Sequence, residues 1–148
     1  MITIEKAKLQ DLGSIIAIEQ HVFNTDSYPA FVIRQLFDIS GHYFLVAKEN
    51  NSILGYALGG LNTENMQGWV LSLGVHQDGR GKGLGKQLTA QLIEVLKAEN
   101  VREIALTVYP DNDAAIKIYR NLGFEGDVIL DNYFLDNEDR IIMTLKTN

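Results

Sequence analysis

The sequence predicts an α/β fold, and three observations lead to that class. Segments that have the apolar pattern of strands alternate along the chain with segments that have helical spacing. In the middle, an apolar strand passes through a glycine-rich turn into an amphipathic helix and then into a second apolar strand, which makes a right-handed crossover unit. A chain of 148 residues with 46% hydrophobic content is expected to form one domain, 1–148, around one core.

The first half of the chain is expected to contain a strand, two helices and a hairpin. The apolar spacing places them at residues 2–8, 12–23, 30–39, 43–48 and 53–61. Asp11 is suitably placed to cap the first helix. A polar turn at residues 49–52 joins the two strands of the hairpin.

The second half continues the alternation with four strands and two helices. The expected ranges are 69–75, 84–96, 101–108, 113–121, 124–130 and 140–145. The first of these helices places Leu84, Leu88, Leu92, Val95 and Leu96 along one face. Gly123 is expected to end the second helix in a left-handed conformation.

The turn before the helix at residue 84 has a composition suited to binding phosphate. Four glycines alternate there with three cations, in the order Gly79, Arg80, Gly81, Lys82, Gly83, Gly85 and Lys86. A helix N-terminus carries unpaired N–H groups and partial positive charge, and glycines let an anion approach them. This junction therefore predicts a pyrophosphate site, although glycines that only reverse the chain direction are the alternative.

Spacing excludes two common phosphate-binding loops. The loop of nucleoside triphosphatases requires Ser or Thr after Gly-Lys, but Gln87 follows Gly85-Lys86. The dinucleotide fingerprint Gly-x-Gly-x-x-Gly has no match, because Leu84 and Lys86 stand where its last glycine is needed. The anion must therefore belong to another class of ligand.

Two motifs resemble those of the GNAT superfamily of N-acetyltransferases. Residues 80–85 read Arg-x-x-Gly-x-Gly, which is similar to the family's acetyl-CoA motif. Residues 112–124 read Asn-x-x-Ala-x-x-x-Tyr-x-x-x-Gly-Phe, which is similar to its second signature. The tail at 132–143 resembles the ribosomal-protein (RimI-like) branch. The resemblance implies a mixed, mostly antiparallel sheet of about seven strands with four flanking helices and with splayed fourth and fifth strands.

The resemblance also implies roles for individual residues. Tyr119 would be the general acid that protonates the leaving thiolate, and its phenol is protonated at neutral pH. The expected acetyl-CoA contacts are Leu73, Gly74, Val75, Arg80, Gly81, Lys82, Gly83, Leu84, Gly85, Lys86, Asn112 and Tyr119. A helix-capping Asn112, a core Tyr119 and an ordinary strand interior at 73–75 are the alternatives that need no ligand.

The general base is not assigned by the resemblance. In the ribosomal-protein branch a glutamate lies on the fifth strand, and Thr107 stands at the matching position here. Threonine cannot take a proton at neutral pH. Chain order leaves Glu64, His76 and Tyr133 as candidates, and we take Glu64 as the working hypothesis. A solvated loop charge, an exposed strand end and a half-buried wall residue are the respective alternatives.

Composition narrows the reaction and its partners. The chain contains no cysteine, so the acetyl group is expected to pass directly to the amine without an acyl-enzyme, and cysteine-bound zinc is excluded. We expect no metal. The net charge of −6 disfavours nucleic acid as a partner. The acceptor is expected to be a peptide or protein N-terminus or a small-molecule amine.

Three further expectations concern location, assembly and an alternative function. No run approaches the roughly 18 apolar residues that span a membrane, and no secretory pattern is present, so we expect a cytoplasmic protein without membrane association. Because domains of this superfamily often pair, a homodimer stays an open alternative. A domain that binds acetyl-CoA as a sensor or assembly module, with little turnover, is the alternative function.

Overall fold

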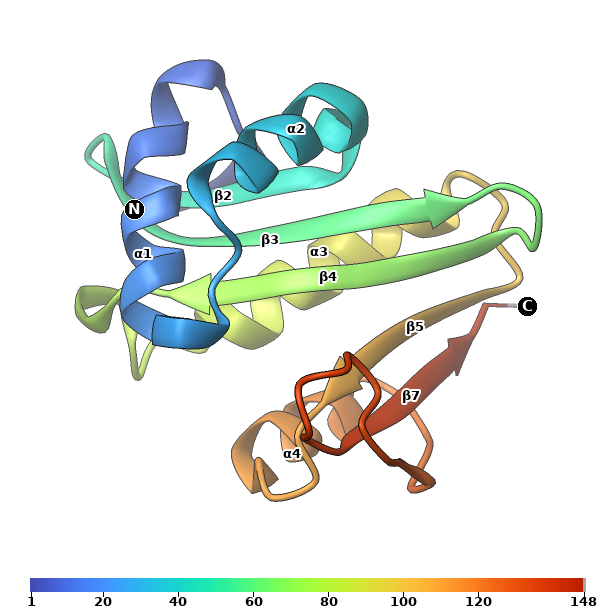
Figure 1. The fold of residues 1–148 in the computed structure, drawn as a ribbon. Coiled ribbons are helices and arrows are strands. Elements are labelled where there is room, and N and C mark those ends of the chain that lie inside the picture. Colours follow the sequence, from blue (N-terminus) through green and yellow to red (C-terminus); the bar gives the residue numbers. More distant parts are fainter. Residues whose placement is uncertain (148) are drawn as a thin grey trace.

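The computed structural model describes residues 1–147 and arranges them as one sheet with helices on both faces (Figure 1). The strands are β1 (Ile2–Lys6), β2 (Phe44–Glu49), β3 (Ser52–Asn62), β4 (Gln67–Val75), β5 (Glu103–Val108), β6 (Ile129–Leu130) and β7 (Arg140–Lys146). The α-helices are α1 (Leu12–Phe23), α2 (Ala30–Ser40), α3 (Leu84–Lys97) and α4 (Asp113–Asn121). The seven-stranded mixed sheet and the four helices of the described chain confirm the expected fold.

The order of the strands in the sheet is β1-β2-β3-β4-β5-β7-β6. Every neighbouring pair is antiparallel except β4 and β5, which are parallel as the crossover through α3 requires. Residues 67–69 of β4 pair with 103–105 of β5, and beyond this point the two strands diverge (Figure 1). The splayed pair expected from the resemblance is therefore confirmed.

Two buried apolar clusters cover the two faces of the sheet. Helices α1 and α2 pack on one face, where Ile15, Ile33 and Phe44 are fully buried. Helix α3 covers the other face with the leucines at 84, 88, 92 and 96, which lie along one side of the helix as the spacing predicted. Residues of α4 join this second cluster. None of the helices within residues 1–147 is long and apolar enough to cross a membrane.

Two local features differ from the sequence-based expectation. Asp11 does not cap α1 with its side chain. Its Oδ2 accepts the backbone N–H of Lys8 at 2.8 Å across a 3₁₀ turn, and its Oδ1 lies 3.2 Å from Lys48 Nζ. The strand expected at 124–130 is reduced to Ile129–Leu130 and one bridge at Glu125. Gly126, at φ +140°, interrupts it in a conformation that other residues rarely adopt.

A polar clamp holds β4, β5 and β7 together at the end where β4 and β5 still pair. Glu103 accepts hydrogen bonds from Gln67 Nε2 at 2.6 Å and from Lys146 Nζ at 2.7 Å. Trp69 Nε1 donates to Gln67 Oε1 at 2.9 Å and extends the clamp along β4. One carboxylate therefore links three strands beside their short parallel contact.

Replacing Glu103 with Gln should lower the free energy of unfolding at neutral pH by about 1 kcal/mol, because a charge-assisted contact is lost. The hydrogen bond from Lys146, and then that from Gln67, holds the pKa of the Glu103 carboxyl below its usual value of 4.5. Its stabilisation is complete above that value and is lost as the pH falls through the lowered pKa of the folded state.

Urea unfolding of wild type and Glu103→Gln from about pH 2 to pH 7 measures this difference. The two stabilities should converge in acid. Glu94→Gln is the control, because Glu94 is 68% exposed and lies 3.7 Å from Lys97 on the surface of α3. A difference in the free energy of unfolding between wild type and Glu103→Gln that does not change through the acid range would show that the ionised carboxylate of Glu103 does not stabilise the fold.

Candidate active site

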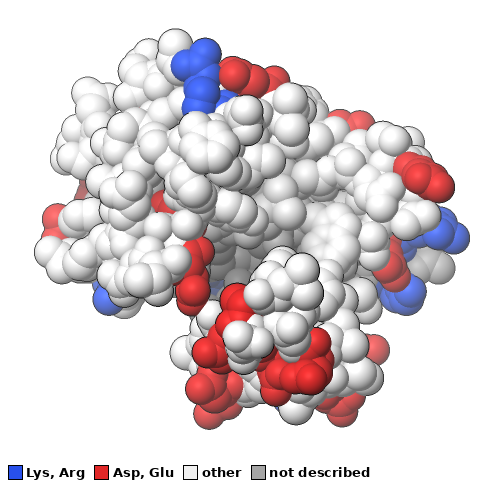
Figure 2. All heavy atoms as spheres, viewed as in Figure 1, with Lys and Arg blue, Asp and Glu red and all other residues white. Residues whose placement is uncertain are grey.

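A cleft of about 460 Å³ opens where β4 and β5 diverge. In the space-filling view it is the hollow between the main body and the smaller lobe formed by α4 and the β6–β7 loop (Figure 2). Its walls come from α1 and the loop after it, β4, β5, α4 and the β6–β7 loop. Among the lining residues are Glu19, Asp26, Tyr28, Leu71, Ser72, Leu73, Thr107, Tyr109, Asn112, Tyr119, Phe134, Asp136 and Arg140.

The wall formed by β4 has an irregular backbone and an unpaired edge. Leu58 pairs with Ser72 and Gly59 with Val70, so Leu71 is an extra residue that forms a β-bulge. The bulge puts Leu71 and Leu73 among the cleft residues together with Ser72. On the side facing β5, no strand of residues 1–147 pairs with β4 beyond Trp69. Backbone donors and acceptors of this edge are therefore available to a ligand.

The glycine-rich turn contains left-handed backbone conformations, which glycine adopts readily. Gly81 and Gly83 have φ values of +78° and +72°, and Gly83 immediately precedes α3. The side chains of Arg80, Lys82 and Lys86 are exposed, and Lys82 Nζ lies 3.6 Å from Glu49. The first-turn N–H groups of α3 and these cations can thus meet one anion.

The glycines of the site differ in whether the packing of the protein requires them. A Cβ at Gly74 would lie 2.6 Å from the Tyr56 ring, and one at Gly79 would lie 2.9 Å from the Leu84 side chain. A Cβ at Gly85, in contrast, would make only ordinary contacts, at 3.9 Å to Leu73 and 4.0 Å to Ile118. The packing of the protein itself therefore does not require glycine at 85.

Leu84 stands apart from the other residues of the expected cofactor set. Its side chain is 1% exposed and belongs to the core under α3. Only its backbone could face a ligand, because the side chain points into the protein.

Tyr119 and Asn112 lie on the same wall of the cleft, at the two ends of α4's inner face. Tyr119 is 9% exposed, its ring packs edge-on against Phe124, and burial raises the pKa of its phenol. Within residues 1–147 no group accepts a hydrogen bond from its hydroxyl. Asn112 Oδ1 caps α4 by accepting the Ala115 N–H at 3.2 Å. The capping alternative for Asn112 is thus correct, and its amide group still borders the cleft.

A cluster around Arg140 joins two walls of the cleft. Tyr109 donates a hydrogen bond to Asp26 Oδ2 at 2.6 Å and accepts one from Arg140 Nη2 at 3.0 Å. Arg140 is 6% exposed, lies over the Tyr109 ring at 3.9 Å and is 2.9 Å from Asp136. The Asp26 hydrogen bond raises the pKa of Tyr109 to about 12. The loop after α1 is thereby tied to β5 and β7.

The structure does not bring the three candidate bases into the cleft lining. Glu64 lies in the exposed β3–β4 turn, where its N–H bonds Asn62, at the opposite end of β4 from Leu73. Tyr133 is half-buried and packs edge-on against Phe134. Thr107 does line the cleft.

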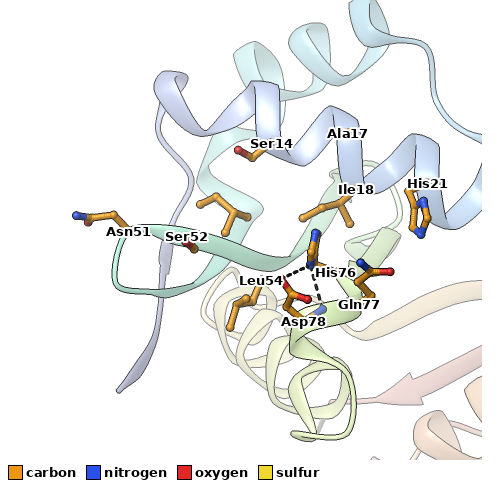
Figure 3. Close-up of a pocket in the computed structure, with 11 residues that line it drawn as sticks. Ser14, Ala17, Ile18, His21, Asn51, Ser52, Leu54, His76, Gln77 and Asp78 are labelled. Atoms are coloured by element: carbon orange, nitrogen blue, oxygen red, sulfur yellow. Dashed lines mark hydrogen bonds and ion pairs between the residues drawn. The ribbon is translucent and has the colours of Figure 1, made fainter.

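His76 borders a separate pocket of about 590 Å³ between α1, the start of β3 and the turn after β4 (Figure 3). The His76 Nδ1 accepts the backbone N–H of Asp78 at 3.0 Å, and the backbone N–H of His76 donates to Leu54 O (Figure 3). Tyr119 and Asn112 do not line this pocket, whereas both line the cleft between β4 and β5. We therefore place the site in the cleft.

Sequence reasoning missed several cleft residues, among them Glu19, Ser72, Tyr109 and Arg140. For Glu19 a signal was available, since it is seven residues after Leu12 and four after Ile15 and so falls on the apolar face of α1. A carboxylate at a core position is unusual. The remaining residues carry no local signal, because their partners are distant in the sequence.

Comparisons with known proteins identify the class. The sequence profile of the Acetyltransferase (GNAT) family matches residues 10–124. The chain therefore belongs to the GNAT family of acetyltransferases. The resemblance to its ribosomal-protein branch is also confirmed.

Individual relatives agree with this membership. An uncharacterized N-acetyltransferase of Methanocaldococcus jannaschii is 31% identical over 144 residues, which cover 97% of this chain and 90% of that protein. The ribosomal-protein-S18-alanine N-acetyltransferase of Escherichia coli is similar with a TM-score of 0.85 and 26% identity, over 100% of this chain and 95% of the other. A chain of the NatC complex bound to Gag peptide and CoA shares the fold, with a TM-score of 0.89, 21% identity and 99% coverage of both.

Replacing Asp26 with Asn should lower the pKa of Tyr109 from about 12 towards its ordinary value of 10.0, because the amide accepts the hydrogen bond without a charge. An NMR titration of tyrosine ring carbons, assigned with Tyr109→Phe, measures the shift. Asp38→Asn is the control, since Asp38 pairs with Arg34 on α2. An unchanged Tyr109 titration in Asp26→Asn would mean that the loop after α1 does not close against β5.

Proposed function

We propose that this protein moves an acetyl group from acetyl-CoA to a primary amine by direct attack in a ternary complex. The observation that carries the proposal is the cleft between the diverging strands. The cleft contains the unpaired edge of β4 and Tyr119, and its lining residues Leu73 and Ile118 lie beside Gly85 at the start of α3. The acceptor would be a peptide or protein N-terminus or a small-molecule amine.

The residues of the site suit acetyl-CoA, which would supply the thioester. Backbone N–H groups at the start of α3, together with Arg80, Lys82 and Lys86, would hold the pyrophosphate. The surface at Gly85, where a Cβ would make only ordinary contacts, and the unpaired edge at residues 73–75 would hold the pantetheine arm. Backbone N–H groups of that edge would also stabilise negative charge on the carbonyl oxygen.

Tyr119 is suited to the role of general acid. Burial raises the pKa of its phenol, so the hydroxyl keeps its proton at neutral pH and can donate it to the departing sulfur. Because no described group accepts its hydrogen bond, the proton is not committed to a partner within the protein.

The surroundings of the cleft favour a cationic acceptor. Acidic side chains gather over α4 and the β6–β7 loop beside the hollow (Figure 2). Asp26 and Asp136 line the cleft itself. An α-amine is largely protonated before it reacts, so carboxylates at the entrance would raise its local concentration. The similarity to an enzyme whose name specifies an alanine N-terminus of a ribosomal protein supports a peptide acceptor.

Free thiol should appear when acetyl-CoA is mixed with the protein and one class of amine from a panel of N-terminal peptides, polyamines and aminoglycosides. Tyr119→Phe should lower kcat about 10²-fold, because the acid is lost. Its melting temperature should stay unchanged, since its hydroxyl makes no internal hydrogen bond. Tyr43→Phe, which removes a hydroxyl bonded to Glu99, is the control for activity.

Thiol release that Tyr119→Phe leaves intact would remove the proposed role of Tyr119. Binding of acetyl-CoA without thiol release with any amine would instead favour the sensor function. The resemblance to the ribosomal-protein branch implies a glutamate at position 107, and the threonine that stands there instead is the reason to test this second function.

Gly85→Ala should weaken acetyl-CoA binding at least tenfold, because its methyl group would enter the space proposed for the cofactor. The folded protein should be as stable as wild type or more stable, since alanine favours a helix by up to about 1 kcal/mol. Gly13→Ala is a matched control. Gly13 is likewise the second residue of a helix, and a Cβ there meets nothing within 4 Å.

Calorimetric titration with acetyl-CoA and thermal unfolding provide the two readouts. Equal affinity of Gly85→Ala and wild type would place the cofactor elsewhere. Loss of stability in Gly85→Ala would show that the space beside Gly85 is needed by the protein and not by a ligand.

A further inference from the structure

Glu19 is a buried carboxylate that the proposed mechanism has not yet used. It lies on α1, is 2% exposed and belongs to the cleft lining. Its Oε1 accepts hydrogen bonds from the hydroxyl of Tyr56 and from Ser72 Oγ, the latter at 2.8 Å. Its Oε2 accepts the backbone N–H of Tyr28 at 2.8 Å. Two strands, β3 and β4, and the loop after α1 thus direct donors at one side chain.

The positions of the hydroxyl hydrogens follow from this arrangement. A hydroxyl has one hydrogen, and a carboxylate can only accept. Tyr56 and Ser72 therefore both direct their hydrogen to Glu19, although their oxygens lie only 3.1 Å apart. Burial raises the pKa of Tyr56, and the charge of Glu19 raises it further, so Tyr56 keeps its proton. Towards any other group, Ser72 Oγ can therefore act only as a hydrogen-bond acceptor, through its lone pairs.

Ser72 is the member of this cluster that connects it to the cleft. It lies on β4 beside the bulge at Leu71 and lines the cleft. Tyr56 is fully buried and is not a lining residue. The cleft therefore contains a hydrogen-bond acceptor, backed by a carboxylate, in the same cavity as the donor hydroxyl of Tyr119.

We propose that Ser72 and Glu19 form the proton-accepting relay of the acetyl transfer, with Ser72 touching the attacking amine and Glu19 positioned behind it. This inference rests on the proposed function. It supplies the base that Thr107 cannot provide and that Glu64 is too far along β4 to provide. Ser72 is then a catalytic residue, and Glu19 acts through it.

Every proton that moves in the acetyl transfer has a donor and an acceptor. As the amine nitrogen bonds to the acetyl carbon and the carbon–sulfur bond breaks, one N–H proton passes to Ser72 Oγ. The proton already on Ser72 passes to Glu19 Oε1, and the departing sulfur takes the proton of Tyr119. Afterwards Glu19 returns a proton to solvent through Ser72, and Tyr119 takes one up. The products are the amide and the free thiol.

The charged and titratable neighbours of the relay are known from the packing around it. Tyr56 from β3 and Tyr28 from the loop after α1 contact Glu19. The other titratable groups of the cleft are Asp26, Tyr109, Tyr119, Asp136 and Arg140. Of these, Asp26, Tyr109, Asp136 and Arg140 are bonded to one another.

Ser72→Ala and Tyr56→Phe form a matched pair for the test. Each variant removes one buried hydrogen bond to the same Glu19 oxygen, and only Ser72 lines the cleft. Both should lower the melting temperature by a similar few degrees. Ser72→Ala should lower kcat about 10²-fold with the KM for acetyl-CoA unchanged, whereas Tyr56→Phe should stay within threefold of wild type.

Glu19→Gln is a second test of the relay. It should lower kcat to a similar extent as Ser72→Ala, and the double variant should be no slower than the slower single variant, because the two residues act as one unit. If Glu19→Gln fails to fold, the comparison of Ser72→Ala with Tyr56→Phe decides the proposal alone.

Two results would overturn the relay. One is a Ser72→Ala enzyme within threefold of wild type, and the other is an equal loss of kcat in Tyr56→Phe, which would make the cluster purely structural. Wild-type protein that releases no thiol with any amine would refute the proposed function and the relay with it. Wild-type turnover that survives in Ser72→Ala refutes only the relay.

Discussion

The short parallel contact between β4 and β5 is the constraint on which the site depends. Pairing stops after Trp69, and the Glu103 carboxylate fixes the end where the strands still meet. From there β5 carries α4 and β7 away from the first four strands. An unpaired strand edge inside a protein is costly unless something bonds to it. Here that edge becomes a wall of the cleft.

Local signals were enough to predict the helices and the position of the glycine-rich turn. Apolar spacing located the helices, and alternating glycines located the turn before α3. Contacts between distant segments were not accessible in the same way. Tyr109 and Asp26 are 83 positions apart, and Ser72 and Glu19 are 53 positions apart. The sequence around one member of such a pair therefore does not indicate the other. Glu64 was misplaced because chain order does not reveal at which end of β4 the cleft opens.

Glycine has several meanings in this chain, and only the structure separates them. At positions 81 and 83 the backbone needs a positive φ, while at 74 and 79 neighbouring atoms leave no room for a side chain. Gly85 meets neither condition. A sequence motif treats these positions as equivalent, yet the backbone and packing of the protein do not require glycine at position 85.

The arrangement of the sheet also has a consequence for the order in which the chain folds. Strands β2, β3 and β4 are consecutive in sequence and in the sheet, whereas β5 reaches its place only after α3 has crossed the face. Contacts of short sequence separation form first, because closing a long loop costs entropy. We therefore expect the lobe of β5, α4 and β7 to dock late, and a ligand that bridges both walls would stabilise the docked state by mass action. A partly synthesised chain carries the glycine-rich turn before it carries a binding site.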